Sequence, residues 1–346
     1  MKKLLAVLLV LFILVGCSKE SKPVVKVYNW GEYIDREVIK EFEKEYNVKV
    51  QYDVFTSNEF MYTKLASEDY DVLVPSDYMI QRLIEEDKLQ EIDLSKITNF
   101  DKVSDTYKGL HFDPENKYSV PYFVGSVGMV YNKEIIDEKL IEEKGWDILF
   151  EESLKDKFFF YNSERDAFMV ALKALGYSMN TEVESELNEA YDWLVKMKKD
   201  MKPVYVDDYV IDAMASGEKD LAIMYSGDAA YVLSENESLA YIEPHQGTNT
   251  WTDGMVISKN AQNVQGAHDF INFILREDVS EKISTKVGYT SPITSVSDKL
   301  SAEGGAYEGI SAYIPRANYA KDEEFFYNAK VKTVMNELWS KITASK

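Results

Sequence analysis

The chain has 346 residues and a formal net charge of −21 at pH 7, and its aromatic residues comprise 24 Tyr, 16 Phe and 5 Trp. So acidic a chain repels the phosphate backbone, which argues against nucleic-acid binding, and its single cysteine excludes an internal disulfide. The length suffices for two domains with a substantial core. The rings exceed what such a core requires, so we expect some of them to line a binding site.

Residues 1–16 are predicted to form a secretory signal peptide. A basic start is followed by the apolar run Leu4 to Val15, which is shorter than the roughly 20 residues that a membrane-spanning helix needs. The run ends at Gly16-Cys17, which resembles the lipobox of bacterial lipoproteins and implies cleavage before Cys17 and a lipid on its sulfur. Residues 17–23 are predicted to be a polar tether. The alternative is an ordinary cleaved signal with a chance cysteine.

Strands and helices alternate along the rest of the chain, which favours an α/β sheet with right-handed crossovers. The strands are expected at 24–28, 48–52, 71–74, 127–131, 158–161, 221–225 and 255–258. The helices are expected at 35–46, with Asp35 as its N-cap, and at 58–66, 79–86, 167–175, 183–199, 264–275 and 325–342.

The residues of common catalytic and metal sites are scattered or missing from the sequence. His111, His245 and His268 are far apart, and none has the spacing of a metal ligand. No phosphate-binding glycine motif and no GxSxG elbow occurs, and with 60 acidic residues carboxylate pairs arise by chance. We therefore predict a protein that is not an enzyme and has no metal or cofactor.

Rings, hydroxyls and acids recur just after the predicted strands, where open α/β sheets bind ligands. These residues are Trp30, Tyr33, Ser76, Tyr78, Tyr225, Asp228, Trp251 and Asp253. An alkyl diammonium needs this chemistry, because each buried methylene contributes about 0.8 kcal/mol and each ammonium requires carboxylates or ring faces. Taken singly, each ring fits core packing, and Asp77 or Asp228 fits a helix cap. Sugar sites also combine rings with acids, so this chemistry leaves cation and sugar open.

The opening Tyr28-Asn29-Trp30-Gly31-Glu32-Tyr33-Ile34 resembles the YNW-x-EYI start of the polyamine-binding proteins of ABC transporters. The similarity continues in order over nearly all of the chain after Cys17. It runs through Ser57-Asn58-Glu59, Tyr70-Asp71-Val72-Leu73-Val74-Pro75-Ser76, Ser119-Val120-Pro121-Tyr122, Ala171-Leu172-Lys173-Ala174-Leu175-Gly176-Tyr177-Ser178, Ile271-Asn272-Phe273-Ile274-Leu275-Arg276 and Gly288-Tyr289-Thr290-Ser291-Pro292.

The resemblance implies an α/β, two-lobed periplasmic-binding-protein fold (type II-like) with the ligand in the interlobe cleft. The first lobe would comprise residues 24–127 and 254–295, and the second 128–253 and 296–346. It further implies a monomeric protein that captures putrescine or spermidine and delivers it to an ABC permease. Only the N-terminal lipid would touch the membrane.

The resemblance also implies which residues bind the ligand. Those that match the family are Trp30, Tyr33, Ser76, Tyr78, Trp251, Asp253 and Tyr289. Asp253 would be the main carboxylate for a terminal ammonium, with Trp30 and Trp251 flanking the alkyl chain. Tyr225 stands where the family usually has Trp, and Asp166 where it has Glu.

Several positions depart from the family pattern. Gly31 replaces a small hydroxyl residue, and the C-terminal contact aligns only loosely near Phe325, which we do not assign. Ser163 falls where spermidine-preferring members place an additional Asp. Tyr225-Ser226-Gly227-Asp228 resembles the W-x-GD segment of putrescine-preferring members, in which the Asp meets an ammonium. Together, Ser163 and Asp228 favour putrescine slightly.

Three other functions remain open on the sequence alone. A sensory protein that reports polyamines to a receptor would have the same fold and pocket. A related binding protein would take thiamine, a sugar or iron, although the adjacent tyrosines of iron-binding relatives are missing, since no Tyr-Tyr pair occurs. A secreted hydrolase would turn its substrate over.

Overall fold

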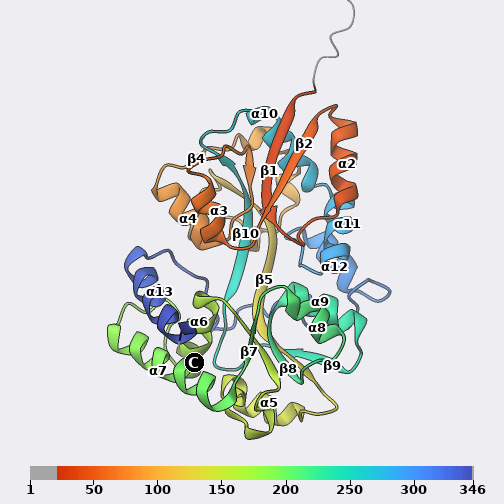
Figure 1. The fold of residues 1–346 in the computed structure, drawn as a ribbon. Coiled ribbons are helices and arrows are strands. Elements are labelled where there is room, and N and C mark those ends of the chain that lie inside the picture. Colours follow the sequence, from red (N-terminus) through yellow and green to blue (C-terminus); the bar gives the residue numbers. More distant parts are fainter. Residues whose placement is uncertain (1–21, 345–346) are drawn as a thin grey trace, which may run out of the picture.

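The computed structural model describes residues 22–344; the predicted signal peptide, Cys17 and most of the tether lie outside them. Within this range ten strands form one curved sheet in the order β2-β1-β3-β10-β5-β8-β6-β7, with β4 beside β10 and β9 beside β5 (Figure 1). The strands are β1 (Val24–Trp30), β2 (Lys49–Phe55), β3 (Val72–Leu73), β4 (Leu89–Gln90), β5 (Ser119–Asn132), β6 (Phe158–Tyr161), β7 (Val204–Val206), β8 (Leu221–Tyr225), β9 (Leu239–Ile242) and β10 (Thr250–Ser258). The predicted α/β class is confirmed.

Helices cover both ends of this sheet. They are α2 (Arg36–Glu45), α3 (Asn58–Lys64), α4 (Asp77–Glu85), α5 (Glu138–Lys144), α6 (Glu164–Ala174), α7 (Glu184–Met201), α8 (Tyr209–Ala215), α9 (Ser226–Glu235), α10 (Val264–Ile274), α11 (Glu277–Val287), α12 (Thr294–Ser301) and α13 (Ala329–Ala344). The predicted N-cap of α2 is present, since the Asp35 carboxylate accepts from the backbone N–H of Glu37 at 3.0 Å.

Two long antiparallel strands, β5 and β10, extend from the upper part of the molecule in Figure 1 toward the lower part. The first half of β5 pairs with β10, and from Val127 onward β5 pairs with β8 and β9 instead. The pairing of β10 with β5 also shifts register between Asp253 and Gly254. Both irregularities lie close to the lobe boundaries predicted at 127 and 253, which remain a prediction.

The two long strands extend beyond the expected ranges of 127–131 and 255–258. In β5 every residue from Ser119 to Tyr131 is buried, so the alternation that marks a half-exposed strand is missing. Pro121 lies opposite Gly254, next to the register shift, where its missing N–H is tolerated. The proline and the unbroken burial explain why the first part of β5 was not predicted as a strand from the sequence.

Residues after α12 contact α11 before the chain turns back. The hydroxyl of Tyr307 donates to the carbonyl of Thr285 at 2.9 Å, and the Tyr313 hydroxyl lies 2.8 Å from Ser284 Oγ. Since α11 belongs to the predicted first lobe, the segment up to Tyr313 packs against that lobe. The lobe boundary predicted after residue 295 therefore stays a prediction.

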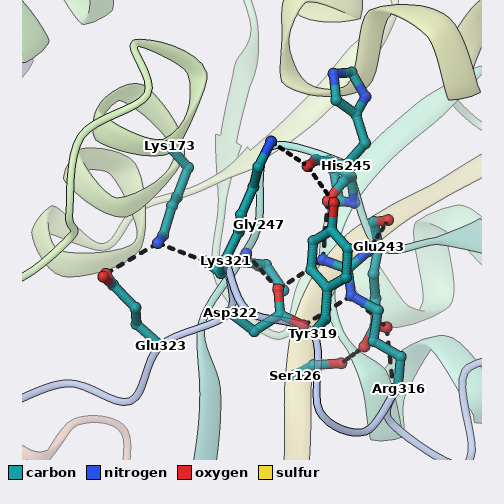
Figure 2. A network of polar contacts seen from close by, with 12 residues as sticks. Ser126, Lys173, Glu243, His245, Gly247, Arg316, Tyr319, Lys321, Asp322 and Glu323 are labelled. Atoms are coloured by element: carbon teal, nitrogen blue, oxygen red, sulfur yellow. Dashed lines mark hydrogen bonds and ion pairs between the residues drawn. The ribbon is translucent and has the colours of Figure 1, made fainter.

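Figure 2 shows the polar network that fixes the returning segment before α13. The Arg316 guanidinium donates to both carboxylate oxygens of Asp322, at 2.6 and 2.7 Å, and to the carbonyl of Glu243 at 2.8 Å. Lys173 of α6 lies 2.9 Å from the carboxylate of Glu323. These contacts tie the segment to the end of β9 and to α6, so α13 returns alongside α6 and α7 (Figure 1).

Asp71 ties β1, β3 and the start of α10 together. It is 2% exposed, and its carboxylate accepts from the backbone N–H groups of Lys26 at 2.8 Å and of Gln262 and Asn263 at 2.7 Å. Asp71→Ala is expected to lower the free energy of unfolding by roughly 3 kcal/mol, because it leaves buried amides without an acceptor. Urea unfolding measures this. The exposed pair of Glu37 and Lys40 supplies the control, since Glu37→Ala should change little.

Candidate functional site

Asp253 lies on β10 at the register shift and is only 4% exposed. The Tyr33 hydroxyl donates to its Oδ2 at 2.7 Å, and its backbone forms a bridge with Ser76. Among the described residues, its Oδ1 has no hydrogen-bond partner. Burial raises the pKa of Asp253 to about 6, although the nearby Ser76 and Tyr33 hydroxyls partly offset this rise. The site therefore holds a buried carboxyl with a free oxygen.

A second carboxyl, that of Asp228, lies in the first turn of α9. The Tyr289 hydroxyl donates to its Oδ1 at 2.8 Å, and the Tyr161 hydroxyl to its Oδ2 at 3.3 Å. Burial raises the pKa of Asp228 to about 7, while those two hydroxyls oppose the rise. The Tyr289 ring stands edge-on to Tyr33, with centroids 4.9 Å apart, so neighbouring rings connect the two carboxyls.

The third carboxyl belongs to Asp166, in the first turn of α6. The Tyr225 hydroxyl donates to its Oδ2 at 2.8 Å, and the Tyr225 ring stacks on Tyr161 with centroids 4.5 Å apart. Burial raises the pKa of Asp166 too. Tyr161 therefore connects the two acids: its hydroxyl bonds to Asp228, and its ring stacks on Tyr225, which bonds to Asp166. Tyr161 was not predicted to act at the site, because it ends the unbroken aromatic run of β6, a pattern that is typical of a core strand.

Ser76 and Tyr78 flank the first residue of α4 and share one partner, Asn58. The Asn58 amide nitrogen donates to Ser76 Oγ at 3.1 Å and to the Tyr78 hydroxyl at 3.0 Å. The Arg165 guanidinium carbon lies 3.7 Å from the centre of the Tyr78 ring, and Phe325 lies 6.3 Å from it. Phe325 thus stands beside a predicted binding residue. Neither Asn58 nor Arg165 was predicted to act at the site.

The indoles of Trp30 and Trp251 lie against other aromatic rings. Trp30 packs on Phe55 with ring centroids 4.6 Å apart, and Trp251 lies 5.6 Å from the Tyr289 ring. Among the described residues, neither indole Nε1 has a hydrogen-bond partner. Gly31 follows Trp30 and is partly exposed; the nearest atom to a Cβ added there would be Asp208 Oδ2, at 4.0 Å.

Two glycines make room for these rings. A Cβ on Gly125 would lie 2.3 Å from the Trp251 indole, and one on Gly227 would lie 2.2 Å from the Tyr289 ring. Both positions therefore require glycine, since any side chain would displace a ring. Sequence reasoning missed them because neither residue offers chemistry of its own.

The geometry favours a cationic ligand. Within residues 22–344, the structure records no ion pair between a basic side chain and Asp228 or Asp253, while aromatic rings lie around both. In the same range no group of His, Cys, Asp and Glu is arranged to hold a metal ion. The three histidines lie elsewhere: His268, for example, accepts from the backbone N–H of Asp93 at 3.0 Å.

The strands β5 and β10 join two groups of strands in this mixed α/β protein, and the acids and rings of the candidate site come from both groups. The chain belongs to the bacterial extracellular solute-binding protein family, whose model matches residues 37–311. It is 33% identical over 279 residues to a spermidine/putrescine-binding periplasmic protein of Escherichia coli, covering 80% of this chain and 79% of the relative. It is 27% identical over 352 residues to the putrescine-binding periplasmic protein PotF of that organism, covering 96% and 94%.

Solved structures agree with this assignment. A putative spermidine/putrescine ABC transporter protein from Listeria monocytogenes is 35% identical, with a TM-score of 0.84 over 93% of this chain and 99% of that one. The spermidine/putrescine substrate-binding protein PotD from Streptococcus pneumoniae is 32% identical, with a TM-score of 0.78 over 93% and 98%. The predicted periplasmic-binding-protein fold is therefore confirmed.

Proposed function

We propose that this protein captures a polyamine in the cleft between its two predicted lobes and delivers it to the permease of an ABC transporter. Family membership supports a solute-binding role, and the names of the relatives above support a polyamine as the solute. In this proposal the protein binds its cargo without turning it over. The ligand contacts would come from the predicted residues, with Tyr161 added through its bond to Asp228.

Asp253 is the observation that carries this proposal. A buried carboxyl with a free oxygen is costly in its charged form unless a cation reaches it. A terminal ammonium brings the missing charge and the missing donors, and the Trp30 and Trp251 rings can cover the methylenes beside it. A neutral sugar would leave the negative charge uncompensated. Asp228 is partly exposed, and both of its oxygens accept from tyrosine hydroxyls, but among the described residues no basic side chain forms an ion pair with it, so it can serve a second ammonium.

Closure of the lobes would exclude water from these pairs. Tyr289 of the predicted first lobe donates to Asp228 of the predicted second lobe, which supports a site formed by residues of both lobes. A ligand that is contacted from both sides would bind the closed form better than the open one and would shift the equilibrium toward it.

The proposal also includes attachment to the membrane by a lipid on Cys17, with residues 17–23 as tether and 1–16 as the removed signal. The family is extracellular by its description. In the part of the chain that the structure describes, no helix is long and apolar enough to cross a membrane. A lipid at Cys17 would keep the protein beside its permease. Metabolic labelling with a fatty acid, compared between the unmodified chain and Cys17→Ser, tests this part.

A thermal-shift panel tests the proposed function. The ligands are putrescine, cadaverine, spermidine, spermine, thiamine and simple sugars. A ligand at 100 times its Kd adds about 2.7 kcal/mol to the free energy of unfolding, which gives a clear rise in Tm. We expect the diamines and triamines alone to raise Tm. A rise with a sugar or thiamine, and none with any polyamine, would refute the proposal.

The choice between putrescine and spermidine is expected to depend on Ser163 and Asp228, with putrescine bound more tightly by the unmodified chain. Ser163→Asp should move the preference toward spermidine by adding a carboxylate for a further ammonium. Ser163 is the N-cap of α6 and accepts from the backbone N–H of Asp166 at 3.4 Å. Because Asp caps helices as well as Ser does, the variant should fold normally. Calorimetric titration measures the Kd of both ligands for the two proteins. Tighter binding of spermidine than of putrescine by the unmodified chain would contradict the expectation.

A further inference from the structure

The segment Ser57-Asn58-Glu59 begins α3, and each of its side chains has a defined role. Ser57 Oγ accepts from the backbone N–H of Phe60 at 3.1 Å and so caps the helix. This cap fixes the directions in which the next two side chains leave the helix. Asn58 is 3% exposed and turns toward Ser76 and Tyr78, whereas Glu59 contacts residues of the predicted second lobe.

The Asn58 amide fixes two predicted binding residues at once. Its nitrogen donates to both hydroxyls, those of Ser76 and Tyr78, and its oxygen accepts from the backbone N–H of Ser76 at 3.2 Å. Both of its donors are therefore in use. A rotation of Asn58 would release both hydroxyls together.

Glu59 reaches across to two cations of the predicted second lobe. Its Oε1 lies 2.8 Å from Lys332 Nζ on α13 and 3.9 Å from Arg165 Nη2 on α6. Although burial acts in the opposite direction, the charges of Arg165 and Lys332 hold the pKa of Glu59 below its ordinary value. Glu59 is therefore ionised and able to hold both cations.

Arg165 covers one face of the Tyr78 ring. Its guanidinium carbon is 3.7 Å from the centre of that ring and 5.1 Å from the centre of the Phe325 ring, and the Arg165 side chain is 15% exposed. A guanidinium at this position attracts the aromatic face. Tyr78 is thus held from α3 through its hydroxyl and from α6 through its ring.

We propose that Asn58, Glu59 and Arg165 are positioning residues that clamp Tyr78, and that the clamp is complete only when the two lobes are closed. The inference rests on the proposed function, because Tyr78 is a predicted ligand contact. Arg165 also precedes Asp166, so the movement that brings Arg165 onto Tyr78 brings Asp166 into the cleft. Opening the lobes would break the Arg165 contacts with Tyr78 and Glu59, and it would release the ligand.

Arg165→Met tests the clamp, with Arg165→Lys as the conservative variant. Stopped-flow measurement of tryptophan fluorescence gives the rates for putrescine and spermidine. We expect Arg165→Met to speed dissociation about tenfold with little change in association, because the contact forms only after the ligand has entered. Arg165→Lys keeps the charge and should restore part of the slow dissociation. Glu41→Gln, which removes an ion pair with Lys282 at 2.8 Å inside the predicted first lobe, should leave both rates unchanged.

Asn58→Ala and the double variant Asn58→Ala/Arg165→Met complete the test. Since both residues act through Tyr78, their effects on the dissociation rate should combine to less than the product of the single effects. Multiplicative effects, or an Arg165→Met dissociation rate equal to that of the unmodified chain, would overturn the clamp while leaving the proposed function intact. If the unmodified chain binds no polyamine, both proposals fail. Tm measurements on each variant separate a loss of fold from a loss of positioning.

Discussion

Asp253→Asn is expected to weaken polyamine binding by at least about 2 kcal/mol, which corresponds to roughly thirtyfold in Kd. The change preserves the shape of the side chain and removes its charge. A buried ammonium would then lie beside a neutral amide whose nitrogen is itself a donor. The Tyr33 hydroxyl, now 2.7 Å from Asp253 Oδ2, would remain a neutral partner and could not replace the lost charge.

The same substitution should have the opposite effect on the ligand-free protein. Burial raises the pKa of Asp253 to about 6, so at pH 8 its ionised form costs the folded state about 3 kcal/mol relative to an unperturbed Asp. Asp253→Asn removes that cost and should keep or raise Tm at pH 8. Asp53→Asn makes the same chemical change at an acid bonded to Tyr70 in the β2 region and should leave affinity unchanged. Unchanged affinity in Asp253→Asn, measured by calorimetry, would refute the proposed site.

Polyamine affinity is expected to fall steeply as the pH is lowered from 8 to 5. Burial raises the pKa of Asp228 to about 7 and that of Asp253 to about 6, whereas an alkylammonium stays charged throughout this range. Binding needs the ionised carboxyls, so protonation competes with the ligand. At pH 5 a group with a pKa of about 7 that must lose its proton weakens binding on the order of a hundredfold, and one with a pKa of about 6 weakens it about tenfold further.

The stability of the ligand-free protein should change in the other direction. Because the folded-state pKa values of both acids are raised, their contribution to stability is present at low pH and is lost as the pH rises to about 6 and about 7.

Asp228→Asn should flatten the pH dependence of binding. An affinity that is constant between pH 5 and 8 would show that neither carboxyl pairs with the ligand.

The sequence predicted the elements that have strong local patterns. The strands at 158–161 and 221–225 have the predicted limits, because these apolar runs of 4 and 5 residues end at turn residues and are too short for helices. The long strands β5 and β10 were predicted only in part, since an unbroken buried pattern and a proline hide their extent. Their role in joining the two strand groups depends on pairings between residues more than a hundred positions apart, which no local pattern encodes.

Some residues of the candidate site could be predicted from the sequence, and others could not. Asp253 and Asp228 could be selected because rings and acids at predicted strand ends suit a ligand, and Tyr289 because it matches the family pattern. The structure connects the three through Tyr33. Asn58 and Arg165 could not, because they act through Tyr78 and their positions become meaningful only in three dimensions. The glycines at 125 and 227 are needed for the space that they leave, which a sequence pattern does not display.

A crystal structure of the protein with putrescine at pH 8 shows whether Asp253 holds a terminal ammonium. We expect one ammonium within about 3 Å of Asp253 Oδ1, the distance of a charge-assisted hydrogen bond, with the methylenes between the Trp30 and Trp251 rings. The second ammonium should lie against Asp228 or Asp166. Putrescine bound elsewhere, with Asp253 Oδ1 still without a partner, would show that Asp253 is not the ammonium site.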